Sequence, residues 1–440
     1  MKKIFIILLA IATALIGYSQ DKKEENDKEK EVEKKKFGIS FSGYVKSDFF
    51  YDTRQVVAAR EGHFLFWPSP EKLDMNDEDI NAKANFNFLS LQSRLTGKIS
   101  GPDALGAKTS GLIEGDFFAQ ANDNINLFRL RHAFIKFNWK TTELLTGQFW
   151  NPLFITGCFP GTVSFNTGTP LQSFARNPQI RLTQDIGDFK IIVAALSQRD
   201  YSTWSNNNTA SSSYLRNSGI PDMHLQVHYE RNNEEAGTGF LIGAGMAYKT
   251  IVPRLESKIN DSVTYKVDEK VSGITAIGFA KLKLKPVTIK VQGRYGENIS
   301  DLLSVSGYAL KEVVDPVTQE CSYTPIKNVT FWGEIHTNGK TWQVGIFGGY
   351  LKNLGTKDAL SDESLSDLES SIYGFGRGIE SLLRISPRVI YNINKIRLAL
   401  ELEYTSASYG DKDSYDVNYI SSSTTTVANL RTLFSVYYLF

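Results

Sequence analysis

The 440-residue chain contains only 2 cysteines and 4 methionines, so it has neither a disulfide framework nor a composition typical of a helical core. It also has no excess of either charge, with 49 Lys and Arg against 48 Asp and Glu, which disfavours nucleic-acid binding by bulk charge. After the N-terminus it has no run of about 18 apolar residues, which excludes a polytopic helical membrane protein. Tyr (20), Phe (27) and Gly (34) are plentiful instead, and this composition favours an all-β protein.

The N-terminus has the pattern of an export signal. Residues 1–19 combine a basic start at Lys2 and Lys3 with an apolar stretch and small residues near Ser19, so we expect cleavage before Gln20. A retained anchor is the alternative, but the apolar stretch is short for a membrane span. Residues 20–36 follow, and from Asp21 onward they hold seven acidic and seven basic residues around a single Val. We expect a solvated periplasmic spacer there, or a short helix that associates with copies of itself.

Alternating strands are predicted throughout residues 37–440. Segments of about ten residues carry apolar side chains at every second position, as in a strand with one apolar and one wet face. Leu89, Leu91 and Leu95 share one parity, for example, with polar residues between them. The same alternation occurs from Ile274 to Leu284. The sequence therefore predicts a long series of β-strands.

The connections between these segments alternate in length. Seven short joins carry turn residues, near positions 101–103, 140–142, 186–188, 232–234, 285–286, 338–340 and 392–394. Eight long connections lie between them, near positions 53–85, 119–126, 150–177, 200–221, 251–272, 298–325, 353–380 and 409–427. Fifteen connections join sixteen strands. Short turns on one rim and long loops on the other are typical of a transmembrane antiparallel β-barrel, whose closure removes free sheet edges.

The last strand gives a separate signal. Leu430, Phe434, Tyr438 and Phe440 lie on one parity, and the sequence ends in Phe. This resembles the terminal signature of bacterial outer-membrane barrels that their assembly machinery reads. The alternative is an aromatic strand that happens to end a chain.

Polar side chains of the opposite parity would line the lumen. On the strands near the N-terminus they are Lys46 and Asp48, Gln92 and Arg94, Glu114 and Asp116, Arg129 and Arg131, and Gln179, Arg181 and Thr183. A guanidinium facing hydrocarbon is destabilising, so the arginines are expected to face water or protein. They could attract anions, or they could pair with Asp48, Glu114 and Asp116 to hold the wall together. The strand with Arg129 is ambiguous, because Ile135 shares its parity.

The connection over residues 150–177 differs from the other loops because it is apolar and aromatic, with three Pro and three Gly. We expect it to fold into the barrel and narrow it, or else to pack on a neighbouring subunit. Its candidate constriction residues are Phe154, Phe159, Phe165 and Arg176, and across the wall Asp48, Glu114 and Asp116 complete the candidate constriction.

Other chemistry has little support. Cys158 and Cys321 fall in two different long connections, where free thiols are favoured over a disulfide. His224 and His228 lie four apart on one strand, which is a weak metal signal, and we assign no metal site. No nucleophile elbow, phosphate loop or zinc-protease helix occurs, so no enzymatic activity and no cofactor are expected.

Several segments in the first half of the chain together resemble a known family. They are Gly43 to Gln55, Gly97 to Asp103, Glu114 to Phe118, Asn126 to Phe134, Gly147-Gln148 and Arg176 to Arg181. They look like the DcaP-type trimeric outer-membrane porins, in a form similar to those of the Bacteroidetes. The resemblance implies a sixteen-stranded barrel, a homotrimer and uptake of small anionic solutes such as dicarboxylates past a basic constriction. It implies that role for Arg94, Arg129, Arg131, Arg176 and Arg181.

The leading hypothesis is therefore an outer-membrane porin for passive diffusion of small polar or anionic solutes. Its expected partners are outer-membrane lipid and lipopolysaccharide, further copies of itself, and the barrel-assembly machinery through the strand that ends at Phe440. The alternative is a surface receptor or adhesin whose lumen is plugged by residues 150–177. A barrel hydrolase would need a Ser or Asp with a His on one rim, and no such pair is evident.

Overall fold

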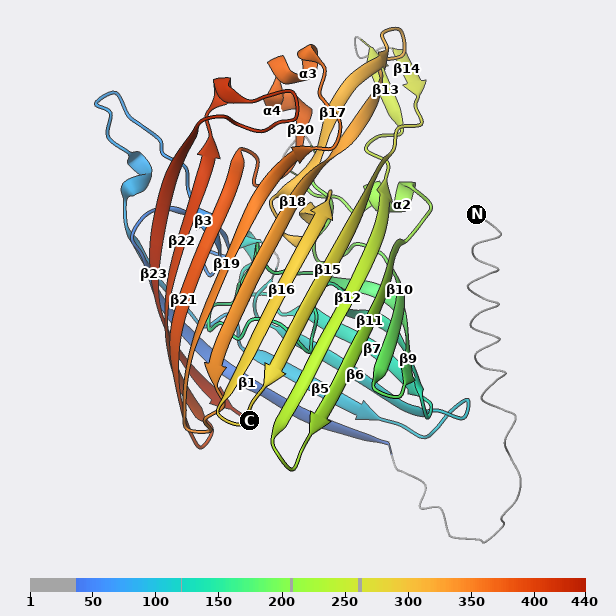
Figure 1. The fold of residues 1–440 in the computed structure, drawn as a ribbon, viewed down its shortest axis with the longest axis vertical. Helices are drawn as coiled ribbons and strands as arrows, with labels where there is room; N and C mark the ends of the chain where they lie inside the picture. The colour runs from blue at the N-terminus through green and yellow to red at the C-terminus, as the bar shows by residue number, and fades with distance from the viewer. Residues whose placement is uncertain (1–36, 120, 206–208, 260–262) are drawn as a thin grey trace. The chain divides into compact units, whose positions relative to one another are not determined.

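The computed structural model describes residues 37–119, 121–205, 209–259 and 263–440. The predicted signal peptide and most of the sequence ahead of the first strand therefore lie outside the described residues. The described part is built mainly of strands, and the long ones are connected in sequence order as up-and-down neighbours (Figure 1). Among the described residues no helix is long and apolar enough to cross a membrane.

The wall of the barrel consists of long antiparallel strands. They are β1 (Gly38–Asp52), β4 (Asn85–Leu89), β5 (Arg94–Ser100), β6 (Lys108–Asp116), β7 (Arg129–Asn138), β8 (Thr142–Trp150), β9 (Arg176–Ile186), β10 (Phe189–Leu196), β11 (Asp222–Asn233), β12 (Thr238–Ile251), β15 (Val271–Lys283), β16 (Val287–Glu297), β18 (Glu320–Thr337), β19 (Trp342–Thr356), β21 (Ile379–Ile393), β22 (Ile396–Gly410) and β23 (Thr424–Leu439).

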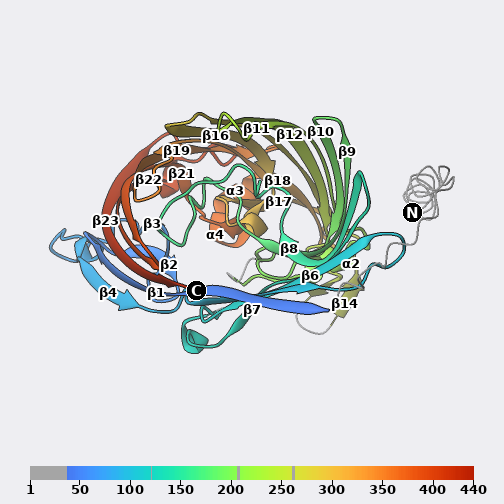
Figure 2. The same cartoon turned by 90° about the horizontal axis from the view of Figure 1, so that it is seen from below.

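The sheet closes on itself because β1 pairs with the last strand, β23, from Tyr44 opposite Leu439 to Asp52 opposite Arg431. Strands β4 and β5 both pair with β1 and share one position in the wall. The result is a closed antiparallel barrel of sixteen strands, as the sequence predicts. Figure 2 shows the closed ring from below, with chain inside it.

The remaining elements belong to the long connections. They are β2 (Val56–Ala59), β3 (Phe64–Pro68), β13 (Glu256–Ile259), β14 (Val263–Lys266), β17 (Ser306–Asp315), β20 (Ile372–Phe375), α2 (Ser213–Asn217), α3 (Asp362–Ser366), α4 (Leu368–Ser371) and four 3-10 turns, Ile80–Ala82, Asn122–Asn124, Ser300–Leu302 and Lys412–Ser414. Most of these elements gather at the upper end of the barrel in Figure 1, and the tight turns lie at the lower end. The predicted alternation of short and long connections is confirmed.

Side chains alternate between the outside and the interior, as the two faces of a strand require. On β22, Leu400, Leu402 and Tyr404 are exposed on the outer surface, whereas Glu401 and Glu403 between them are buried inside. The outer surface of the barrel thus carries apolar side chains, and the interior holds the buried charges.

One predicted facing is wrong. Leu89 and Leu91 were expected to share the outer face with Leu95, but Leu91 is buried in the interior core and Leu89 packs against it. The strand is interrupted between β4 and β5, so the parity changes there: Phe88 is exposed before the break and Leu95 after it. A shift of one residue moves every following side chain to the other face of a sheet.

The apolar core lies inside the barrel and is built largely from connections. Residues 151–175, which we call the inward loop, contribute Phe154, Phe165 and Phe174. Strand β3 contributes Phe64 and other apolar residues. Inward side chains of the wall, among them Trp332 on β18 and Phe347 on β19, belong to the same cluster. An apolar core thus occupies part of the barrel interior.

Candidate functional site

Charged side chains from three adjacent strands meet on the inner wall. Strand β6 contributes Glu114 and Asp116, β5 contributes Arg94, and β7 contributes Arg129 and Arg131. The carboxylate of Asp116 accepts from Arg129 Nε at 2.8 Å and from Arg131 Nη1 at 2.9 Å. Glu114 Oε1 accepts from Arg131 Nε at 2.7 Å, and Arg94 Nε lies 3.7 Å from the same oxygen. The predicted pairing of these arginines with Glu114 and Asp116 is therefore present.

A β-bulge explains why Arg129 and Arg131 face the interior whereas Ile135, at the same parity, faces outward. Glu114 pairs with His132, but the next residue, Gly115, pairs with Leu130, so Arg131 has no opposite residue on β6. Such an extra residue changes the parity of the strand. Arg129 and Arg131 therefore face inward, while Ile135, beyond the bulge, is exposed on the outside. This resolves the ambiguity that the sequence leaves on β7.

Arg176 and Asp200 extend this group toward the long-loop end. Arg176 Nη2 donates to Asp200 Oδ2 at 2.6 Å, and Arg129 Nη1 lies 3.8 Å from Asp200 Oδ1. Burial alone would raise the pKa of the Asp200 carboxyl, but the positive charges of Arg176 and Arg129 hold it below its usual value. Four arginines thus share three carboxylates. Only Arg94 keeps a sizeable exposed fraction, 20% of its side chain.

Asp48 belongs to a separate buried site on β1. Its carboxylate lies 3.1 Å from Lys46 Nζ and 2.6 Å from His63 Nε2, and it accepts from the hydroxyl of Ser435. Further along β1, Asp52 forms an ion pair with Arg431, whose Nη2 lies 2.6 Å from Asp52 Oδ2. The roles of His63 and Arg431 were missed by sequence reasoning. Arg431 lies opposite Asp52 in the sheet but is 379 positions away in the sequence, and no local pattern marks His63 as the partner of Asp48.

The inward loop is tied to the opposite wall by three glutamates. Val163 N–H donates to Glu401 Oε2 at 2.6 Å, and Ser164 N–H donates to Glu401 Oε1 at 3.2 Å. Asn166 Nδ2 donates to Glu403 at 2.9 Å, and the Gly161 N–H donates to Glu334 on β18. Hydrogen bonds to carboxylates are among the stronger ones in proteins. The predicted inward folding of this connection is therefore confirmed, and hydrogen bonds to the opposite wall hold it in position.

Basic side chains hold the same loop from other directions. Lys46 Nζ donates to the Val163 carbonyl at 3.2 Å, Arg384 Nη1 to the Thr169 carbonyl at 2.6 Å, and Arg294 Nη1 to Ser173 Oγ at 2.7 Å. Arg384 Nη2 also donates to the Phe66 carbonyl at 2.5 Å, which joins the inward loop to strand β3. The two segments therefore form one interior layer.

The candidate constriction aromatics lie in different surroundings. Phe154 and Phe165 are buried in the interior core, whereas Phe159 is 37% exposed. Sequence reasoning missed that Phe64 to Trp67 on β3 are also buried inside the barrel. The signal was available, because Phe64 to Trp67 are four consecutive large apolar residues within a long connection.

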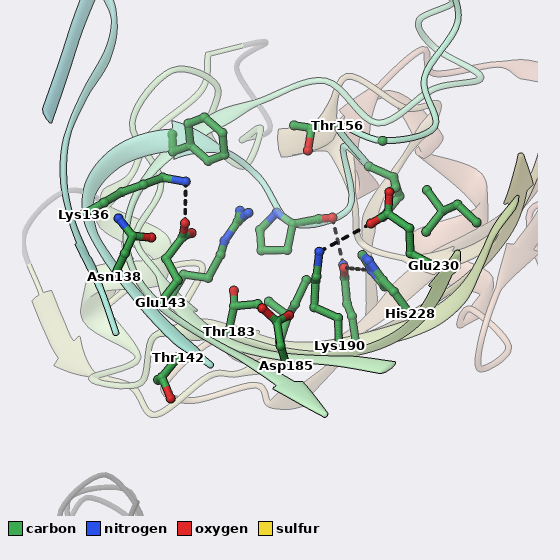
Figure 3. A pocket seen from close by; sticks show the side chains of 18 of the residues that line it. Lys136, Asn138, Thr142, Glu143, Thr156, Thr183, Asp185, Lys190, His228 and Glu230 are labelled. Carbon is green, nitrogen blue, oxygen red and sulfur yellow. Dashed lines mark hydrogen bonds and ion pairs between the residues drawn. The ribbon is translucent and has the colours of Figure 1, made fainter. Parts of the chain in front are cut away.

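A polar cavity of about 370 Å³ lies on the tight-turn side of the inward loop (Figure 3). Two ion pairs line it, Lys136 with Glu143 at 2.8 Å and Lys190 with Glu230 at 3.4 Å. Arg181 also lines it, and among the described residues this guanidinium takes part in no ion pair; it donates instead to Gln179 Oε1 and the Trp150 carbonyl. We call this cavity the vestibule. Arg181 is therefore apart from the other four arginines.

The remaining sequence candidates are simple to place. Cys158 in the inward loop is buried and Cys321 at the start of β18 is half-buried, and both are free thiols. Burial raises the pKa of the Cys158 thiol to about 11. His224 lies beside Asp222 at 3.0 Å, and His228 beside Gln226. Within the described ranges, no three His, Cys, Asp or Glu side chains are grouped as metal ligands would be.

Comparison with known proteins gives structural likeness only. No family model matches the chain, and no curated protein does. The outer membrane channel DcaP of Acinetobacter baumannii is 15% identical, with a TM-score of 0.65 over 92% of this chain and 97% of that one. The anion-selective porin from Comamonas acidovorans is 9% identical, with a TM-score of 0.51 over 92% and 100%. The trimer form of OmpT, an outer membrane protein of Vibrio cholerae, is 10% identical, with a TM-score of 0.51 over 92% and 99%. The chain thus has a porin-like barrel fold.

Proposed function

We propose that this chain is an outer-membrane porin through which small polar solutes, anions in particular, diffuse passively. The apolar outer surface of a closed barrel supports insertion into a bilayer, because the pairing of β1 with β23 leaves the wall without a free edge strand. The inward loop sets the size limit in this proposal. No step in it is chemical, and no cofactor takes part.

The observation that carries the proposal is the position of Arg181. It lines the vestibule beside the inward loop and takes part in no ion pair within the described residues, whereas Lys136 and Lys190 are each paired with a glutamate. Asp185 also lines the vestibule and likewise takes part in no ion pair within those residues. An unpaired cation in a confined aqueous space raises the local concentration of anions. Dicarboxylates fit such a path, since a guanidinium binds carboxylates in a bidentate way.

The assembled state is part of the same proposal. We infer a homotrimer, supported by the trimer form of one structural neighbour and by the sequence resemblance to DcaP-type porins. The strand ending at Phe440 is proposed as the signal for the barrel-assembly machinery; Phe440 exchanges backbone hydrogen bonds of 3.1 Å with Gly43 on β1. Export by a cleaved signal peptide over residues 1–19 stays a proposal from sequence.

Liposome swelling tests the proposal. Liposomes that contain the protein are diluted into a dicarboxylate, a neutral sugar or a diamine of similar size, for the wild type and for Arg181→Ala. A unit charge about 7 Å away in water contributes about 0.6 kcal/mol, or about threefold in local monoanion concentration. We therefore expect the anion-to-neutral rate ratio to fall about threefold or more in Arg181→Ala.

Arg231→Ala is the matched control, because Arg231 is exposed at the tight-turn end of β11 and does not line the vestibule. It should keep the wild-type ratio. Equal ratios in all three proteins would contradict the role of Arg181, and absence of swelling with every solute would contradict the porin.

A second candidate is a surface receptor or adhesin with a closed lumen. The observation that favours it is the interior apolar core, in which the inward loop and β3 pack together instead of leaving open space. It predicts no permeation by any solute, together with binding to a surface or partner through the long loops. The swelling experiment separates the two candidates.

A further inference from the structure

The barrel wall has a gap at its long-loop end between β7 and β8. The backbone ladder of these strands ends with Ala133 opposite Gln148, although β7 begins at Arg129 and β8 continues to Trp150. In place of the ladder, Gln148 Nε2 donates to the Arg131 carbonyl at 3.0 Å and lies 3.4 Å from the Leu130 carbonyl. A side chain thus fills part of a gap that backbone pairing leaves.

A cavity of about 320 Å³ opens at this gap. Its outer border is apolar and consists of Leu127, Phe128 and Leu130, which are 61%, 53% and 52% exposed on the outside of the barrel. Its charged border consists of Arg129 and Arg199 together with Asp200. The cavity therefore combines an apolar surface on the bilayer side with two guanidinium groups, and we call it the wall pocket.

Arg129 has unused hydrogen-bond donors there. Its side chain is only 6% exposed, and its Nε donates to Asp116, but neither Nη1 nor Nη2 has a hydrogen-bond partner in the part of the chain that the structure describes. The nearest further carboxylate, Asp200, lies 3.8 Å from Nη1 and is already paired with Arg176. A buried donor without an acceptor is destabilising, and this effect is larger for a charged group.

Arg199 brings a second positive charge. It is exposed, and no ion pair joins it to any residue in the described ranges. Two guanidinium groups at one cavity, of which one is buried with free donors, are suited to a phosphate, whose oxygens accept bidentate hydrogen bonds.

We infer that the wall pocket binds the phosphate-bearing headgroup of an anionic lipid in the outer leaflet, with the acyl chains over Leu127, Phe128 and Leu130. The inference rests on the outer-membrane location proposed above. The apolar border favours a lipid over a soluble anion, because a free phosphate would gain nothing from exposed Leu and Phe side chains. The pocket lies at the long-loop end, where the outer leaflet's phosphorylated glucosamine lipid would place its headgroup.

Native mass spectrometry of the delipidated protein in detergent tests this inference. The probes are diphosphoryl lipid A, the same lipid without phosphates, and inorganic phosphate as a competitor. For the wild type we expect bound diphosphoryl lipid A, at least about tenfold weaker binding of the dephosphorylated lipid, and no displacement by millimolar phosphate.

Arg199→Glu should weaken binding of the phosphorylated lipid about tenfold or more, and Arg199→Lys should recover most of it. Arg129→Gln should weaken binding of the phosphorylated lipid too. If this variant fails to fold because Arg129 also pairs with Asp116, the substitutions of the exposed Arg199 decide the test. Arg216→Ala is the control, because Arg216 is exposed in helix α2 and does not line the wall pocket.

Three outcomes would overturn the inference: equal binding with and without lipid phosphates, equal binding by wild type and Arg199→Glu, or displacement by inorganic phosphate, which would indicate a site for soluble anions. A loss of subunit association in Arg199→Glu without any change in lipid binding would assign the pocket to a second copy of the chain. The lipid-binding measurement does not depend on conduction, so its result can be interpreted even if the porin proposal fails.

Discussion

Removing the carboxylate of Glu401 should release the central part of the inward loop. In Glu401→Ala the backbone N–H groups of Val163 and Ser164 lose the oxygens that accept from them at 2.6 and 3.2 Å. The neighbouring ties, from Asn166 to Glu403 and from Gly161 to Glu334, remain. The loop should therefore stay attached at both sides of the released residues.

The size of the effect follows from these two contacts. A hydrogen bond contributes about 0.5–1.5 kcal/mol when its acceptor is neutral and about 1.5–3 kcal/mol when the acceptor is charged. Losing two at the value where these ranges meet costs about 3 kcal/mol. Each 1.4 kcal/mol changes an equilibrium constant tenfold, so the ratio of released to docked loop should rise about a hundredfold. Water that reaches the freed N–H groups will reduce this figure, which is an upper estimate.

Single-channel recording in a planar bilayer measures this ratio. Glu401→Ala should show frequent, brief conductance increases that are rare in the wild type. Glu234→Ala, an exposed glutamate in the β11–β12 turn, is the matched control and should behave as the wild type does. A folded Glu401→Ala barrel whose current trace is unchanged would refute the claim that these hydrogen bonds hold the loop.

Three further predictions concern single residues. Asp116→Asn should lower the free energy of unfolding by about 3–5 kcal/mol, because it removes the carboxylate that two buried arginines, Arg129 and Arg131, share. Urea unfolding against Asp103→Asn, an exposed turn residue, checks this, and equal midpoints would contradict it. Maleimide at pH 7 should label half-buried Cys321 well before buried Cys158, whose pKa is raised to about 11, and mass spectrometry showing equal rates would contradict the burial. The pKa of Asp200 is lowered in the folded state, so its contribution to stability is complete above the usual Asp value of about 3.9 and is lost as the pH falls below that value. This acid-dependent loss of stability should be absent in Asp200→Asn. An identical pH profile of the free energy of unfolding for both proteins would contradict it.

The architecture of the barrel is predictable from local sequence because both of its signals are local. Alternation of apolar residues marks the strands, and turn residues mark the tight joins, so the count of sixteen and the position of each connection are confirmed. The inward folding of residues 150–177 is predictable as well, because exposed loops are seldom so apolar.

The facing of individual residues is harder to predict where the ladder is irregular. The break before Arg94 reverses the parity of Leu89 and Leu91, and the bulge at Arg131 turns two successive residues inward. Bulges depend on hydrogen bonding between strands, which no local pattern records. The ties from Glu401 to Val163 span more than two hundred positions, so the sequence alone could not show them.

The arginine prediction divides into two parts in the structure. Arg94, Arg129, Arg131 and Arg176 gather around shared carboxylates, whereas Arg181 lies in the vestibule. Sequence parity places all five inside the barrel but cannot show which of them are neutralised. The role of each in binding a solute stays a prediction.

Conductance of the purified full-length protein in a planar bilayer under a salt gradient tests the central claim most directly. The account predicts stepwise conductance increases, in groups of three for a homotrimer, with a reversal potential that indicates a preference for anions. Insertion of a folded barrel without any conductance would contradict it and would favour the receptor with a closed lumen.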